Sequence, residues 1–298
     1  MAAYHIARSL KKGVCMKFCT QKAHSLTEGI SMIKLEELSK RLEPFGVIHG
    51  FSDCRDGNQG FGHDSAAGVL LKRNAFLARA HPELRVADAV GMVPFSPGAE
   101  ETVHIVRSHQ QASGMRRLGS GLRGEALILA ESEVKRGLHA ADRAPARALF
   151  LATGDCIAGV LADPVARVIA MVHGSRESLV REVPRAAVNI MQEHCGVNPE
   201  NLLVGLGPGI RTYELQHFEP AAGADSPWAP YVELRADGIR LDLFGYFRFL
   251  LTDAGVPDDQ IWEVPADTFT DVAFASHRRA KETGEAEWRH AAVVAFAP

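Results

Sequence analysis

The segment LATGDCIAGVLADPVARVIAMVHGSRE, residues 151–177, holds one cysteine and one histidine, each where an apolar run meets polar, glycine-containing sequence. Cys156 directly follows Asp155 at a predicted chain reversal, and His173 ends the next apolar run. A thiolate is both a soft metal ligand and a strong nucleophile, and either role requires partial exposure. The pair therefore predicts either a metal site or a nucleophile with its base.

The spacing of this pair has a simple structural interpretation. If residues 157–162 and 166–173 form a hairpin around the Ala-Asp-Pro turn, Cys156 and His173 come to the same end of it. His109, after the run VHIVRS, is a third candidate donor. A thiolate and two histidines leave one position open, which is typical of catalytic zinc. The alternative to a functional site is that Cys156 is a core residue and that the histidines are surface residues.

The elements that must position these residues alternate between short apolar runs and amphipathic segments. Strands are expected at 148–153, 157–162 and 166–173, and another is expected to continue from Val103 to His109. A helix follows the central runs, and Pro184 either kinks it or begins it. Because strands and helices mix without strict β-α-β alternation, we expect a single α+β domain.

Composition excludes several classes of protein. The 298 residues are 46% hydrophobic and 23% charged, and the net charge of −3 comes without a Lys/Arg block. We therefore expect neither a nucleic-acid nor a membrane partner. No apolar run approaches the ~18–20 residues of a membrane span. Five cysteines are too few, and odd in number, for a disulfide framework, which favours reduced thiols in the cytoplasm.

The first 33 residues differ from the rest, since they are basic and Glu28 is their only acid. They lack the long apolar region of a secretory signal. A transit-like leader, a start placed ahead of Met32 and a disordered tail are all compatible with this composition, and the last two are favoured. We therefore expect residues 1–33 to be a disordered or non-native extension and residues 34–298 to be the catalytic domain.

Several short motifs, in order, resemble the laccase-domain family, also called the multicopper polyphenol oxidase family. The resemblance covers about residues 47–296. Each motif is weak by itself, but seven in the same order are specific. They are HGFSDCRDG, VRSHQQASG, TGDC, LADP, VHG, PENLLVGLGPGIRTYEL and FASHRRAKETGE.

This resemblance implies an α+β fold similar to that of cysteine-hydrolase deamidase toxins. It also implies a purine nucleoside phosphorylase with added adenosine deaminase activity, acting on purine nucleosides and phosphate. Family members hold zinc, sometimes copper, through His, Cys and His, and the matching positions here are His109, Cys156 and His173. An oxidase with a copper cluster is not expected, because the chain contains no His-x-His pair.

Further residues are assigned to the substrate by the same resemblance. Arg176 or Arg211 would neutralise a bound phosphate. Tyr213 and Glu214 match a family Tyr-Glu pair that contacts substrate or packs in a loop. Asp155 would either orient a metal ligand or cap its turn.

The chain also departs from the family pattern. The family's Gly-Trp-Arg-Gly after the histidine is Ser-Arg-Glu-Ser here, residues 175–178, so the arginine is one place early. Three hypotheses follow. The first is a zinc enzyme acting on purine nucleosides. The second is a metal-independent hydrolase or deamidase with Cys156 as nucleophile and His173 as base. The third is a metal-binding protein that has lost catalysis.

Overall fold

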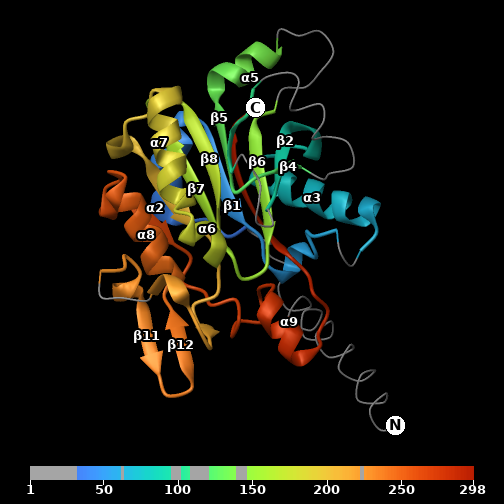
Figure 1. Cartoon of the computed structure of the whole chain (residues 1–298). Helices are drawn as coiled ribbons and strands as arrows, with labels where there is room; N and C mark the ends of the chain where they lie inside the picture. The colour runs from blue at the N-terminus through green and yellow to red at the C-terminus, as the bar shows by residue number, and fades with distance from the viewer. Residues whose placement is uncertain (1–31, 62–63, 95–101, 108–120, 139–145, 222–224) are drawn as a thin grey trace.

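The computed structural model describes residues 32–61, 64–94, 102–107, 121–138, 146–221 and 225–298. Within these ranges, two large β-sheets stack face to face and helices cover their outer faces (Figure 1). A small third sheet lies beside them. The predicted α+β class is confirmed.

The strands of each sheet come from distant parts of the chain. The six-stranded sheet has the order β13 (Ile261–Glu263), β9 (Leu203–Leu206), β7 (Ile157–Asp163), β8 (Val168–Gly174), β5 (Ala126–Ala130), β3 (Val103–Ile105). The five-stranded sheet has the order β1 (Val47–Phe51), β14 (His290–Phe296), β6 (Ala148–Thr153), β2 (Ala89–Val93), β4 (Leu122–Arg123). The small sheet has the order β10 (Tyr213–Leu215), β12 (Gly238–Leu241), β11 (Val232–Arg235).

The helices bury one face each against these sheets. On the six-stranded sheet lie α7 (Val183–Cys195) and α8 (Leu243–Asp253), whereas α3 (Ala66–Ala80) packs on the five-stranded sheet. The remaining helices are shorter: α2 (Glu36–Leu42), α5 (Glu131–Leu138), α6 (Arg176–Val180) and α9 (His277–Thr283). No helix in the described ranges is both long enough and apolar enough to span a bilayer.

The central strands are apolar along their whole length, without the alternation of a half-exposed strand. Every residue of β7 and β8 is buried. Leu149 and Leu151 of β6 share one apolar cluster with Val160 of β7 and Met171 of β8. A sheet covered on both faces buries both sides of each strand, which explains these continuous apolar runs.

The predicted hairpin is confirmed. β7 and β8 pair antiparallel, with Ile157 opposite Gly174 and Asp163 opposite Val168. The prediction of a strand reaching His109 is wrong, because β3 ends at Ile105. The physical reason lies in its partner: Ile105 pairs with Ile128, and β5 ends at Ala130 where α5 begins, so β5 is too short to extend the pairing to position 109.

Pro184 begins a helix and does not kink one. It lies in the first turn of α7, where its missing N–H leaves no hydrogen bond unmade. Glu182, just before that helix, has a left-handed backbone with φ of 55°, which separates α6 from α7. This break turns the chain from the end of β8 onto the face of the six-stranded sheet.

Residues 1–31 lie outside the described ranges, so the interpretation of the N-terminus as an extension stays a prediction. Its expected boundary is too late, however. Met32 is buried, and Ile33 exchanges backbone hydrogen bonds with Phe51 of β1. The fold therefore includes these two residues.

Candidate functional site

A cavity of about 590 Å³ is lined by residues of α6 and α9, among others. Its wall includes Asp155, Cys156, Arg176 and Tyr213, all predicted from the sequence. It also includes three residues that the sequence did not single out: His277, Arg278 and Lys281. The structure therefore brings four of the predicted site residues together around one space.

Cys156 owes its place to a crossing between the two sheets. β6 ends at Thr153 in the five-stranded sheet, and β7 begins at Ile157 in the six-stranded sheet. The three residues between them turn sharply, and Asp155 has a φ of 80°, which is rare outside glycine but tolerated by aspartate. The half-buried Cys156 is thereby held where the end of β6 meets the start of β7, at the same end of both sheets.

His173 is oriented by a buried carboxylate. Its Nδ1 lies 2.5 Å from Oε2 of Glu125, and both side chains are almost completely buried. Burial by itself lowers the pKa of His173, but its interactions with Cys156 and Glu125 outweigh burial and raise that pKa to about 9. Because Glu125 engages Nδ1, Nε2 is the ring atom that remains for a second partner.

These donors meet some requirements of a metal centre. Thiolate and imidazole suit zinc or copper, and a carboxylate behind a histidine is the usual partner of a metal ligand. In the described part of the chain, however, no three His, Cys, Asp or Glu residues gather closely enough to hold a metal. His109 lies outside the described residues. The described residues therefore supply two of the predicted ligands, Cys156 and His173, and the third lies outside them.

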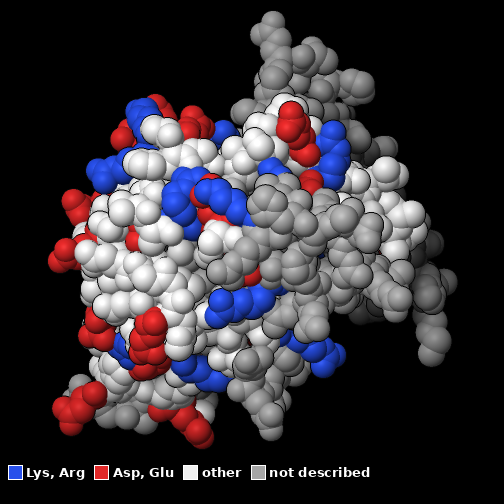
Figure 2. Space-filling view, turned by 90° about the horizontal axis from the view of Figure 1, so that it is seen from above, with Lys and Arg blue, Asp and Glu red and all other residues white. Residues whose placement is uncertain are grey.

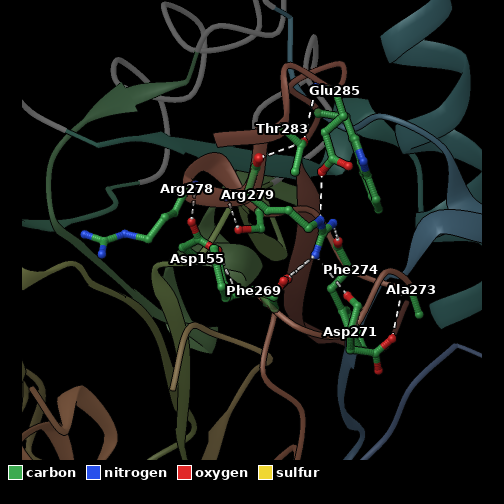
Figure 3. A network of polar contacts seen from close by, with 12 residues as sticks. Asp155, Phe269, Asp271, Ala273, Phe274, Arg278, Arg279, Thr283 and Glu285 are labelled. Atoms are coloured by element: carbon green, nitrogen blue, oxygen red, sulfur yellow. Dashed lines mark hydrogen bonds and ion pairs between the residues drawn. The ribbon is translucent and has the colours of Figure 1, made fainter. Parts of the chain in front are cut away.

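Asp155 holds the turn together. Its Oδ1 accepts a hydrogen bond from Thr268 Oγ1 at 2.8 Å, and its Oδ2 accepts one from the backbone N–H of Arg278 at 2.7 Å (Figure 3). Both carboxylate oxygens are thus engaged by the protein. Of the two predicted roles for Asp155, these contacts favour the structural one.

A buried arginine organises the segment that faces Cys156. Arg279 is 8% exposed and forms an ion pair with Glu285 at 2.8 Å (Figure 3). Its guanidinium also donates to four backbone carbonyls, those of Thr268, Phe269, Asp271 and Phe274. This network fixes the loop before α9 and, with it, the helix that carries Arg278 and Lys281.

The altered segment 175–178 forms the first turn of α6. Ser175 caps the helix by accepting from the N–H of Ser178. The hydroxyl of the buried Ser178 donates to the carbonyl of His173 at 2.6 Å. Arg176 lines the cavity and pairs with Glu177 at 2.9 Å. The segment thus holds the backbone of His173 through Ser178 and places Arg176 in the cavity wall.

Two predicted substrate residues do not line this cavity. The Arg211 guanidinium donates to the carbonyls of Val264 and Ala266 and lies 4.0 Å from the ring centroid of Phe244. Glu214 is exposed and pairs with Arg235 at 3.2 Å. Their contacts give both residues structural partners, so their predicted substrate roles gain no support from the geometry.

Tyr213, by contrast, lines the cavity, and its ring packs against the guanidinium of Arg278. The Arg278 guanidinium lies 4.6 Å from the ring centroid of Tyr213, and its Nη1 donates to the carbonyl of Glu214 at 2.6 Å. Stacking and hydrogen bonding hold the planar group in a defined orientation.

The residues that the sequence missed lie far from the central segment in the chain. Arg278 and Lys281 belong to FASHRRAKETGE, which carried part of the family resemblance but contributed no site residue. Glu125 precedes an apolar run and had no neighbour in sequence to mark it. The family resemblance of FASHRRAKETGE was the only sequence signal that could have pointed to Arg278 and Lys281, and no signal pointed to Glu125.

The surface of the described part is mixed in charge. Acidic and basic side chains lie next to one another on the face shown in Figure 2. This agrees with the small net charge of −3.

Comparison with solved structures shows a shared fold. The chain superposes on Bacillus licheniformis hypothetical protein YfiH with a TM-score of 0.68 and 21% identity, covering 90% of this chain and 97% of that one. It superposes on YlmD from Geobacillus stearothermophilus with a TM-score of 0.67 and 21% identity, covering 86% and 94%.

Sequence comparison finds curated relatives named purine nucleoside phosphorylase. The one from Deinococcus radiodurans is 31% identical over 204 residues, which is 67% of this chain and 72% of the relative. One from Streptomyces coelicolor is 33% identical over 147 residues, covering 46% of this chain and 56% of the relative. A family model described as multi-copper polyphenol oxidoreductase laccase matches residues 129–296. These residues include Cys156, His173 and α9, and the chain therefore belongs to this laccase-domain family.

Proposed function

We propose that this chain is a purine nucleoside phosphorylase-like enzyme whose active site is the Cys156 cavity. Two relatives that bear that name support an enzymatic role. The cavity, at about 590 Å³, falls in the usual range of roughly 300–1,000 Å³ for small-molecule sites. The observation that carries the proposal is the group of cations in its wall: Arg176, Arg278 and Lys281.

Phosphorolysis explains why such cations are needed. The bond between ribose C1′ and the purine nitrogen breaks, a phosphate oxygen bonds to C1′, and the base leaves with the bonding electrons and takes up a proton. A phosphate dianion must therefore be held close to the sugar. The fixed guanidinium of Arg278 offers a planar fork for two phosphate oxygens, and Lys281 adds a point charge from the same helix.

Zinc or copper at Cys156 and His173, and adenosine deamination on that metal, belong to the finer hypothesis that the family resemblance implies. A metal would supply Lewis-acid chemistry at the open coordination position. Because the described donors provide two ligands, the proposed phosphorolysis contains no step through a metal. Deamination would be recognised separately, by inosine formed from adenosine without phosphate.

The test is incubation of purified protein with adenosine or inosine, with and without phosphate. We expect free base and ribose 1-phosphate only when phosphate is present. Arg278→Ala should raise the KM for phosphate at least about tenfold, since it removes a charge-assisted pair of hydrogen bonds. Arg235→Ala is the matched control, because Arg235 lies on β11 and does not line the cavity. Absence of base release from both nucleosides would contradict the proposal.

Cys156 tests the location of the site. Cys156→Ala should abolish most turnover, because Cys156 lines the cavity and interacts electrostatically with His173. Cys195→Ala is the control, since Cys195 lies at the end of α7 and packs beside the core. Full activity of Cys156→Ala would show that the site is elsewhere.

A second candidate is a metal-independent amide hydrolase, favoured by the series Cys156, His173, Glu125. A nucleophile, a base and a carboxylate that orients the base are the parts of a cysteine-hydrolase triad. The thiolate would attack an amide carbon, ammonia would leave with a proton from His173, and water would hydrolyse the thioester. Ammonia release from a carboxamide without phosphate, lost in Cys156→Ala, would support this candidate over phosphorolysis.

A further inference from the structure

The backbone around His173 shows which parts of the chain are able to supply a third metal ligand. β3 begins beside His173, because Val103 pairs with Ala126, which in turn lies opposite Val172. Two residues later, Ile105 pairs with Ile128, opposite Ala170. Each strand residue advances ~3.3 Å, so β3 is already ~10 Å from the level of His173 when it ends.

The chain keeps the same direction after β3. The N–H of Val106 donates to the carbonyl of Ile128, and Nη1 of Arg107 lies 3.7 Å from Glu133 of α5. α5 begins where β5 ends, at the opposite end of the sheet from Cys156. His109 follows Arg107 by two residues, which span at most ~7 Å. The described chain that leads to position 109 therefore runs away from the end of the sheet that holds Cys156 and His173.

A different strand does run to the site. β2 pairs parallel with β6, whose end leads directly to Cys156. At the end of β2, the carbonyl of Val93 accepts a hydrogen bond from the N–H of Gly124, the residue before Glu125. The next residue after Val93 is Pro94, whose side chain has no atom that binds a metal.

The chain returns to the same place from the other direction. The carbonyl of Thr102 accepts from the N–H groups of Glu125 and Ala126. Residues 94–102 thus begin and end beside Glu125, and their sequence, PFSPGAEET, contains no histidine or cysteine. His104, on β3, has its Nε2 2.7 Å from the carbonyl of Arg123 and belongs to no three-residue metal cluster within the described ranges.

We propose that Cys156 and His173 form a two-donor site in this chain, that His109 is not their partner, and that Pro94 occupies the position from which a third donor would reach them. The inference concerns metal binding alone. It stands or falls independently of nucleoside turnover. On this inference, the chain differs from the family pattern in its metal ligands as well as in the segment 175–178.

The test is a zinc titration of the full chain against a chromophoric chelator, with metal content measured after dialysis. We expect weak zinc binding that His109→Ala changes by less than about twofold. Pro94→His should tighten zinc binding at least about tenfold, because it adds an imidazole where β2 reaches the site. Pro94→Ala is the matched control, since it removes the proline ring without adding a donor.

Two results would overturn the inference. One is a loss of zinc affinity of tenfold or more in His109→Ala or His104→Ala. The other is tight, stoichiometric zinc in the unaltered chain that survives both substitutions, because a third ligand would then exist elsewhere. Far-UV circular dichroism checks the fold of each variant. Where Pro94→His fails to fold, the affinities of the unaltered chain, His109→Ala and His104→Ala still decide the question.

Discussion

One wall of the Cys156 cavity comes from the end of the β7–β8 hairpin, at Cys156 and Gly174, and another wall comes from α9 and β10. The hairpin is continuous in sequence, and every residue of its two strands is buried. α9 has only seven residues and is fixed by polar contacts through Asp155, Arg279 and Glu285. Apolar packing thus positions the two strands beside the thiol and imidazole, whereas hydrogen bonds position the helix that carries Arg278 and Lys281.

This difference predicts how each wall fails. An isolated helix of seven residues is too short to be stable in water, so α9 depends on its tertiary contacts. A hairpin inside a covered sheet is instead limited by the space available to its side chains. Substitutions should therefore affect the two walls through different mechanisms, and the following predictions separate them.

The largest expected effect is on the α9 wall, from Arg279→Leu. Removing the guanidinium leaves Glu285 without its partner and four carbonyls without a donor. Because breaking a buried pair costs about 3–5 kcal/mol, Arg279→Leu should lower the free energy of unfolding by that amount. Urea denaturation measures the loss. The double variant Arg279→Leu, Glu285→Leu should recover part of this loss. Equal stability of Arg279→Leu and the unaltered chain would refute the role given to this network.

The link between the two walls comes next. Asp155→Ala leaves the Thr268 hydroxyl and the Arg278 N–H unpaired and places alanine at a φ of 80°. Unpaired buried groups cost about 1–3 kcal/mol, and the left-handed backbone adds roughly 1–2 kcal/mol. Asp155→Asn, which tolerates that backbone and keeps an acceptor, should lose clearly less in the same urea measurement. An equal loss in the two variants would contradict the assigned contacts.

On the hairpin wall, Gly174→Ala should act by crowding. A Cβ at Gly174 would lie 2.6 Å from Cε2 of the Phe247 ring and 3.0 Å from Cβ of Ile157. Overpacking of this kind costs about 1–3 kcal/mol. Phe247→Leu in the same chain should restore part of the stability, as measured by thermal unfolding. Lack of any coupling between the two substitutions would show that the crowding is relieved elsewhere.

The smallest effect compares two helix caps. Ser276 accepts from the N–H of Arg279 at the start of α9, and Ser65 accepts from the N–H of Gly68 at the start of α3. Replacing either serine by alanine should cost about 0.5–2 kcal/mol of stability. Only Ser276→Ala should also weaken phosphate binding, because α9 carries Arg278 and Lys281. Equal phosphate KM values in the two variants would separate the cap from the site.

The central part of the fold was predictable from local pattern. The runs at 148–153, 157–162 and 166–173 correspond to β6, β7 and β8 within two residues at each end. The turn signal between the second and third runs fixes a hairpin, and the hairpin register brings Cys156 and His173 to one end. These features are encoded by neighbours in sequence, so no long-range information is needed to find them.

The amino-acid sequence by itself determined the fold class, the hairpin and the pairing of thiol with imidazole. Only the tertiary structure decided that Glu125 orients His173, that Arg278 and Lys281 face Cys156, and that Arg211 lies elsewhere. It also decided the direction of β3, which carries the chain toward His109 away from the site. The physical reason is that strand pairing between distant segments sets which ends meet, and the hydrophobic pattern of one strand does not specify its neighbour.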